Sequence, residues 1–202
     1  MGPEQQSVFR GARGQHDLGL DSALNTLAAD WSESSVLDTP VQSGADDAST
    51  RSSCPAVSGK IRVCNYDYGN TGWLGIAEIW LLRGRDGHIT HGRTKMNEFY
   101  ADMRSNADAR LHVACQEVGH TLGLDHQRGT GDQTCMNDVY GRWDPAFNHP
   151  NGHDYDELVS IYSHLDGPKK GGPPGSGSKA SDRSVQVREE GEHTVVTFIF
   201  WA

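Results

Sequence analysis

The stretch from Gln116 to His126 reads Gln-Glu-Val-Gly-His-Thr-Leu-Gly-Leu-Asp-His, and it decides how the rest of the chain is interpreted. Residues four apart lie on the same face of a helix, so the side chains of Gln116 and His120 can converge on one point. Glu117 lies beside them. Gly123 predicts the end of this helix, because glycine adopts the left-handed cap conformation at little cost. His126 follows from that turn and can approach the same point from another direction.

This arrangement is typical of a catalytic zinc site, in which three protein ligands leave one coordination position for water. Zinc lowers the pKa of that water to roughly 7, and Glu117 would take its proton. The alternative is an amphipathic helix that ends at an ordinary glycine cap and carries two histidines by chance. The first ligand position holds Gln116, whose amide oxygen is less basic than imidazole, which predicts weaker zinc binding.

Two residues near Gln116 could replace it as a ligand, and neither has the required geometry. His112 precedes His120 by two turns, a Cα separation of about 12 Å, which is too far for both rings to bind one zinc ion. Cys115 lies five residues before His120 and points away from the shared face. Three interpretations therefore stay open: Gln116 binds zinc directly, a water takes its place, or the chain has no catalytic zinc.

The same stretch matches the pattern H-E-x-x-H-x-x-G-x-x-H at every functional position except the first. Further along, the segment Thr-Cys-Met-Asn around Met136 resembles a Met-turn, and residues 151–165 resemble the closing helix of the matrixins. In this order and spacing, the chain resembles the metzincin zinc proteases, and among them the matrixins. The resemblance covers about residues 18–166 and implies a metzincin-like metalloprotease domain.

The resemblance implies an α+β fold with a twisted, mostly parallel sheet, an antiparallel edge strand, two long helices and a C-terminal helix after the Met-turn. Hydrophobic periodicity predicts helices over 21–31 and 107–122, and strands over 60–68, 75–82 and 89–96. In matrixins, the strand that matches 75–82 is the sheet edge that pairs with an extended substrate. Such pairing is chemically natural, because an edge strand offers unpaired backbone groups.

The function that the resemblance implies is that of a zinc-dependent metalloendopeptidase acting on a peptide or protein substrate. Gln116, His120 and His126 would bind one catalytic zinc ion, and Met136 would form an apolar floor beneath it. Glu117 would activate water as general base and pass its proton to the leaving amine. The alternative is a catalytically inactive pseudo-protease that acts as a protein-binding module, which the lost first histidine favours and the retained Glu117 disfavours. We expect a monomer.

Other residues suggest weaker hypotheses about metal binding. Asp125 could orient the neighbouring ligand His126, although an aspartate in a loop needs no such explanation. A second zinc ion or a structural calcium ion is an additional hypothesis, but scattered loop histidines usually bind nothing. The histidines concerned are His88, His91, His149, His153 and His164.

Four cysteines predict two disulfides. Cys54 and Cys64 flank the turn signal Ser-Gly at residues 58–59, so a hairpin would bring them opposite each other. The resemblance implies that the active-site helix and the Met-turn are stacked, and therefore that Cys115 and Cys135 form the second bridge. The alternative is four free thiols.

Composition limits the compartment and the partners. The 202 residues include 24 glycines and are 35% hydrophobic, which suits one modest core with many loops. The net charge of -9 argues against nucleic acid or an anionic membrane as the main partner. No apolar run approaches the roughly 18 residues that cross a bilayer. Two disulfides would indicate an oxidising compartment, so we expect an extracellular protein, although residues 1–14 lack the apolar core of a secretory signal.

The chain divides by composition into four parts. We expect a flexible N-terminal tail at 1–17, the metalloprotease domain at 18–166, a Gly/Pro/Ser linker at 167–184 and a β-hairpin-like segment at 185–202. This last segment is too short to form its own core. Its apolar end, Phe198–Trp201, must dock on the preceding domain, pair with another chain or anchor elsewhere, and we favour docking.

Overall fold

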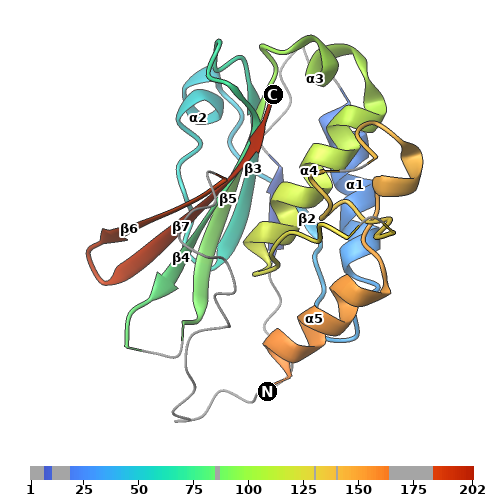
Figure 1. Ribbon diagram of the computed structural model, residues 1–202. Helices are drawn as coiled ribbons and strands as arrows, with labels where there is room; N and C mark the ends of the chain where they lie inside the picture. Colours follow the sequence, from blue (N-terminus) through green and yellow to red (C-terminus); the bar gives the residue numbers. More distant parts are fainter. Residues whose placement is uncertain (1–6, 11–18, 85–86, 130, 140, 164–183) are drawn as a thin grey trace.

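The structure, a computed structural model, describes residues 7–10, 19–84, 87–129, 131–139, 141–163 and 184–202. The fold mixes helices and strands (Figure 1). Seven strands form one sheet in the order β2-β1-β3-β5-β4-β7-β6. The strands are β1 (Ser7–Arg10), β2 (Val41–Ser43), β3 (Lys60–Tyr66), β4 (Trp73–Leu82), β5 (Ile89–Asn97), β6 (Val185–Glu190) and β7 (His193–Trp201).

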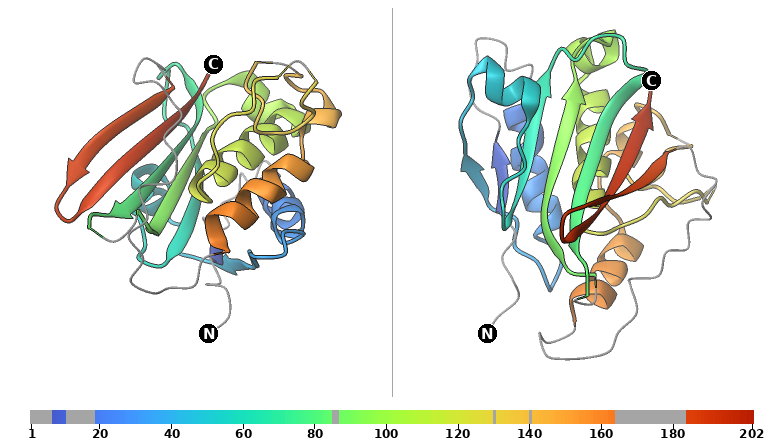
Figure 2. Two further views of the ribbon diagram at one scale, coloured as in Figure 1. Left: turned by 60° about the horizontal axis from the view of Figure 1, so that its bottom comes forward. Right: turned by 90° about the vertical axis from the view of Figure 1, so that its left-hand side faces the viewer.

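The two longest helices cover one face of this sheet (Figure 2). Helix α4 packs against β3, β4, β5 and β7, and α1 packs against α4. The helices are α1 (Leu20–Trp31), α2 (Ala48–Ser53), α3 (Ala101–Ser105), α4 (Ala107–Thr121) and α5 (Gly152–Tyr162), with a short 3-10 helix, η1 (Pro145–Phe147). Each periodic segment of the sequence therefore forms the element that its pattern predicted.

The pairing of the strands differs from the expected sheet. Parallel pairs join β1 to β2, β1 to β3 and β3 to β5, whereas β4 to β5, β4 to β7 and β6 to β7 are antiparallel. The prediction of a mostly parallel sheet is therefore wrong, because half of these pairings are antiparallel. Nor is β4 an edge strand, because the C-terminal strand β7 lies along it (Figure 1).

The N-terminal segment also departs from expectation. Ser7–Arg10 lie within the expected flexible tail, yet they form β1 between β2 and β3. A strand of four residues is too short for alternation to reveal it, and its two neighbours supply its backbone partners. The predicted linker at 167–184 lies outside the described residues except for Ser184.

The main core lies between the sheet and the helices. From α1 come Leu24, Leu27 and Trp31, one apolar stripe at helical spacing, all at most 1% exposed. Gly119 lets α4 approach both α1 and the segment that contains Met136. A Cβ at this position would lie 2.9 Å from a ring carbon of Trp31 and 2.5 Å from the sulfur of Met136. Helix α4 and the methionine segment are thus packed directly against each other.

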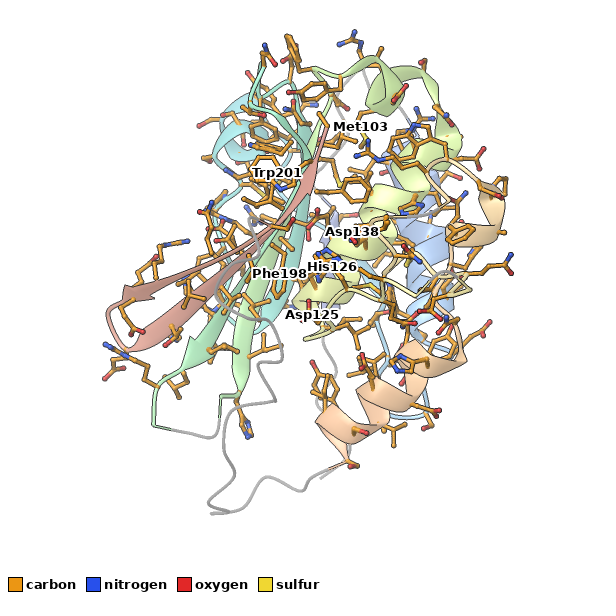
Figure 3. The ribbon with its side chains drawn as sticks, in the orientation of Figure 1. Met103, Asp125, His126, Asp138, Phe198 and Trp201 are labelled. Atoms are coloured by element: carbon orange, nitrogen blue, oxygen red, sulfur yellow. A yellow bond between two sulfur atoms is a disulfide. The ribbon has the colours of Figure 1, made fainter. Side chains whose placement is uncertain are left out.

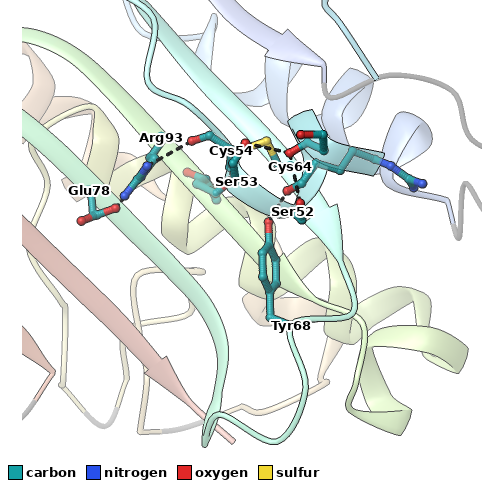
Figure 4. Close-up of a disulfide and its surroundings, with 10 residues drawn as sticks. Ser52, Ser53, Cys54, Cys64, Tyr68, Glu78 and Arg93 are labelled. Carbon is teal, nitrogen blue, oxygen red and sulfur yellow. Dashed lines mark hydrogen bonds and ion pairs between the residues drawn. A yellow bond between two sulfur atoms is a disulfide. The ribbon is translucent and has the colours of Figure 1, made fainter. Parts of the chain in front are cut away.

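Both predicted cysteine pairs lie at disulfide distance. The Cα atoms are 5.9 Å apart for Cys54 and Cys64, and 5.8 Å apart for Cys115 and Cys135. Cys54 is the left-handed C-cap of α2 rather than part of a hairpin, so the first pairing is right although its expected geometry is not. The Arg93 side chain donates to the carbonyl oxygen of Cys54 at 3.2 Å (Figure 4).

Within the ranges described above, no helix combines the length and the apolar character that crossing a membrane requires.

Candidate active site

Helix α4 begins and ends on clear local signals. At its start, the Asn106 side chain accepts hydrogen bonds from the backbone N–H groups of residues 108 and 109. At its end, Gly123 has a φ of 98°, as predicted for the helix break. The N–H of Gly123 donates to the carbonyl of His120 at 3.0 Å, and that of Leu124 to the carbonyl of Gly119 at 3.2 Å. This pair of bonds is a Schellman motif, and it reverses the chain toward His126.

The reversal brings the two predicted histidine ligands together. Their Nε2 atoms lie 3.2 Å apart, and the Nδ1–H of His120 donates to the carbonyl of Leu124 at 2.9 Å. Because Nδ1 carries the proton, Nε2 of neutral His120 presents a lone pair toward His126. Two nitrogens that share one tetrahedral zinc ion at about 2.1 Å lie about 3.4 Å apart. The observed separation is therefore compatible with a shared metal ion.

Gln116 and Glu117 complete the predicted set, and both are fully buried, at 0% exposure. Within the described residues, neither atom of the Gln116 amide and neither oxygen of the Glu117 carboxyl has a hydrogen-bond partner. Buried polar atoms without partners are rare in proteins and are typical of a site for an ion or water, or of a catalytic role. Four such atoms on one helical turn beside two converging imidazoles fit the donor set of a metal site.

Glu117 lies where α4 approaches β4. A Cβ on Gly75 would lie 2.8 Å from a Glu117 carboxyl oxygen, so glycine leaves the space that this side chain fills. Burial raises the pKa of Glu117 well above its ordinary value. The backbone N–H groups of Phe200 and Ala77 counteract this rise in part, without hydrogen bonds of regular geometry. The carboxyl therefore takes up a proton readily in this arrangement.

His126 is surrounded by two carboxylates and an arginine, of which only Asp125 was a candidate from the sequence. Asp125 Oδ1 lies 3.5 Å from Nδ1 of His126, and Asp138 Oδ2 lies 3.6 Å from its Nε2. The Asp125–His126 side-chain contact is the main reason why the pKa of Asp125 falls to about 2. Arg128 Nη2 lies 3.2 Å from Nδ1 and also pairs with Asp138 at 2.9 Å. These groups decide which nitrogen of His126 carries its proton.

The turn at Met136 lies directly beneath α4. The N–H of Asn137 donates to the carbonyl of Thr134 at 3.2 Å, which closes the turn, and Met136 is fully buried. Asp154 of α5 accepts a hydrogen bond from the Thr134 hydroxyl and fixes the turn to that helix. The Cys115–Cys135 bridge connects the turn to α4. Met136 thus packs against the turn of α4 that carries His120, through Gly119.

Aromatic residues of the C-terminal strand cover the site. The Phe198 ring stacks on the His120 ring at 4.3 Å between centroids and 6° between planes. Phe200 meets His112 edge to face at 5.7 Å. Figure 3 shows Phe198, His126 and Asp138 at the boundary between β7 and α4. The alternation of Phe198 and Phe200 is the sequence signal that could have indicated this contact, because both point to the same face of a strand.

The remaining candidate residues do not assemble into a second metal site. Among the residues that the structure describes, no three His, Cys, Asp or Glu side chains converge in a way that would hold an ion. His91 stacks on Trp80, and His149 pairs with Asp30 at 2.7 Å. His153 lies 3.9 Å from Glu157, and His164 falls outside the described residues.

Comparison with known proteins adds no family to these observations. No protein-family model matches the chain, and a search of curated proteins finds no match.

Proposed function

We propose that this protein is a zinc-dependent metalloendopeptidase with a metzincin-like, matrixin-related fold, acting as an extracellular monomer on extended peptide segments. The observation that carries the proposal is the convergence of His120 Nε2 and His126 Nε2 at 3.2 Å, one helical turn after Gln116 and Glu117. The buried polar atoms of these two side chains have no hydrogen-bond partner among the described residues. The glycine-capped helix and the turn at Met136 support it. The two cysteine pairs at disulfide distance fit an oxidising compartment.

Gln116, His120 and His126 would hold the zinc ion. When bound, zinc supplies Lewis-acid polarisation of the scissile carbonyl and lowers the pKa of water. Glu117 would accept the proton of the attacking water and donate it to the leaving amine nitrogen. Its raised pKa suits the second of these steps, in which the carboxyl acts as an acid.

Binding through Nε2 of His126 requires the proton on Nδ1. Asp125 Oδ1, at 3.5 Å, can accept a hydrogen bond from that nitrogen. Arg128 has the opposite effect, because a guanidinium donates hydrogen bonds and its Nη2 faces the same nitrogen at 3.2 Å. Asp125 therefore favours the tautomer that binds metal, and Arg128 disfavours it.

The second candidate function is a protein-binding module without turnover. Two observations favour it: an amide stands where the resemblance implies histidine, and the strand β4 accepts an added strand with phenylalanines against the helix. A module of this kind needs no general base. The fully buried Glu117 is therefore the residue at which the two functions differ most.

The experiment that separates them combines metal content with hydrolysis. We expect purified wild-type protein to contain about one zinc ion per chain, and Glu117→Ala to retain zinc but lose hydrolysis of a quenched peptide library by at least about 100-fold. A wild type that neither binds zinc nor cleaves peptides supports the binding module. Gln116→His should tighten zinc binding in a competitive chelator titration, and Gln133→His in the neighbouring loop is the control.

A further inference from the structure

The C-terminal strand occupies the side of β4 on which an extended peptide would bind. β7 pairs with β4 from Trp201 opposite Trp73 to His193 opposite Leu82, in nine residue pairs. The ladder continues past the end of β7, where the N–H of Ala202 donates to the carbonyl of Gly72 at 2.9 Å. Since β5 pairs with the other side of β4 from Gly75 to Leu81, β4 has a neighbour on both sides over this range.

Two phenylalanines of β7 face the helix that carries the candidate site. Phe198 pairs with Ala77 in the ladder and stacks on His120 at 4.3 Å. Phe200 pairs with Gly75 and contacts His112 edge to face. Because side chains two residues apart lie on the same face of a strand, one extended segment delivers both rings to α4. His112 and His120 lie eight residues apart, so the two rings contact α4 at points about two turns apart.

This contact leaves the site without access to solvent. Gln116 and Glu117 have no exposed surface, and His120 is 1% exposed. Phe198 itself is 8% exposed, as expected of a ring that is enclosed by its contacts. A peptide could reach His120 and Glu117 only after Phe198 has moved.

Most apolar contacts of the hairpin of β6 and β7 lie outside the main core, in a separate cluster where Phe198 packs with Ala77 and Ile79 of β4, and where Val185 and Val196 pack against these residues. Phe200 is the single residue of this hairpin in the main core cluster, as far as the described residues show. Besides the pairing of β7 with β4, polar contacts hold the hairpin. Arg188 pairs with Glu78 at 2.8 Å, and the N–H of Arg83 donates to the carbonyl of Glu192 at 2.9 Å. Because the other apolar contacts of the hairpin lie in this separate cluster, the hairpin can open locally while the main core stays folded.

We propose that β7 is a built-in ligand of the candidate site, an internal strand that holds the place of a peptide with aromatic residues two positions apart. The site then becomes available to another peptide only when the hairpin of β6 and β7 leaves β4. The consequence for catalysis rests on the proposed function. The occupation of β4 and of the His120 ring by β7 is independent of it.

The test uses the full chain with Phe198→Ala and the control Val187→Ala. Val187 lies on β6 of the same hairpin but is 64% exposed, so its truncation leaves the contact with α4 intact. We expect Phe198→Ala to raise hydrogen exchange in β4 and diethyl pyrocarbonate modification of His120 and His126 at least tenfold. Val187→Ala should match the wild type. Equal protection of β4 and of both histidines in the two variants would overturn the proposal.

A labelled peptide with the sequence of residues 193–202 provides the complementary measurement. It should bind to Phe198→Ala, whose own strand is weakened, at least tenfold more tightly than to the wild type. The same peptide with aspartate at both phenylalanine positions should not bind. Equal binding of the two peptides to Phe198→Ala would show that the aromatic spacing is not recognised and would overturn that part of the proposal.

Hydrogen exchange of the wild type and peptide hydrolysis provide two further tests. If Phe198→Ala does not fold, the test is hydrogen exchange in the wild type. The backbone amides of β7 should exchange at least tenfold faster than those of β3. Equal exchange rates in both strands would mean that the hairpin opens only with global unfolding, which would overturn the proposal. If Phe198→Ala opens β4 but no variant hydrolyses peptides with zinc, the inference stands and the proposed function fails. If the wild type hydrolyses peptides while β7 stays protected from exchange, the proposed function stands and the inference about β7 fails.

Discussion

Glu117 carries a carboxyl group that is fully buried and makes no regular hydrogen bond within the described residues. Burial of an ionisable group without a partner opposes folding, and the raised pKa of Glu117 expresses this cost. The side chain that the proposed chemistry requires is therefore unfavourable for the stability of the metal-free protein.

Glu117→Gln should stabilise the metal-free protein by about 1–3 kcal/mol at neutral pH. The folded-state pKa of Glu117 lies above its ordinary value of 4.5, so between these two values the folded state binds a proton that the unfolded state releases. The contribution of Glu117 to the stability of the wild type therefore falls as pH rises through that window. The difference in free energy of unfolding between Glu117→Gln and the wild type grows accordingly. Urea denaturation at pH 4.5 and pH 7.5 measures it, with the exposed Glu189→Gln as control. A variant less stable than the wild type at both pH values contradicts the explanation.

Arg128→Ala should tighten zinc binding about tenfold, which corresponds to about 1.4 kcal/mol. The substitution removes a donor from Nδ1 of His126 and frees Asp138, whose carboxylate lies 3.6 Å from Nε2. Both changes favour a cation at Nε2. Competition with a chromophoric chelator gives the affinity, and Arg104→Ala on α3 is the control for loss of positive charge. Unchanged or weaker binding in Arg128→Ala would mean that the arginine does not set the tautomer.

At the scale of elements, the packing of α4 on the Met136 turn depends on Gly119. An alanine there would place its Cβ 2.5 Å from the sulfur of Met136 and 2.9 Å from Trp31, so α4 or the turn has to shift. Gly119→Ala should lower the free energy of unfolding by about 1–3 kcal/mol in spite of the better helix propensity of alanine. Gly152→Ala in α5 is the matched control, because no described atom lies within 4 Å of a Cβ at that position. Thermal denaturation should give a lower melting temperature for Gly119→Ala than for Gly152→Ala, and equal melting temperatures would contradict the packing argument.

The elements that the sequence predicted are those long enough to show a period. Helix α1 and helix α4 repeat their apolar positions over several turns, and their predicted bounds differ from the observed ones by one residue. The strands β1 and β2 and the helices α2 and α3 have three to six residues each, less than two periods of a helix and at most two repeats of a strand. Their positions follow from neighbours in space, which the local sequence does not encode.

At the scale of the whole molecule, the sequence predicted that His120 and His126 lie together but not what covers them. His126 lies six residues after His120, so the end of one helix and one turn suffice to bring these two side chains together. Phe198 approaches the same point from a strand more than seventy residues further along the chain. The docking of its segment was one of three alternatives from sequence, and the choice depended on pairing with β4, which no local pattern records.

The buried histidines make the stability of the whole molecule sensitive to acid. Burial lowers the pKa of His112 to about 4 and that of His120 to about 3, compared with 6.5 in the unfolded chain. Below pH 6.5 the unfolded state binds protons that the folded state does not, so stability falls on acidification toward these values. The raised pKa of Glu117 acts in the opposite direction. A comparison of the wild type with His112→Asn isolates one histidine: the wild type should lose more stability than the variant between pH 6.5 and pH 4.5 in metal-free urea titrations. Parallel losses would contradict the assignment.

The position of β6 also has a consequence for the behaviour of the protein in solution. With the hairpin in place, the outer border of the sheet is β6, where Arg188, Glu189 and Glu190 carry charge, and the opposite border is the three-residue β2. Charged and short borders resist aggregation, whereas a long apolar one invites it. Departure of the hairpin would uncover ten residues of β4, Trp73–Leu82, most of them apolar. An opened chain is therefore expected to be prone to precipitation and to joining with other copies, so its useful lifetime at high concentration would be short.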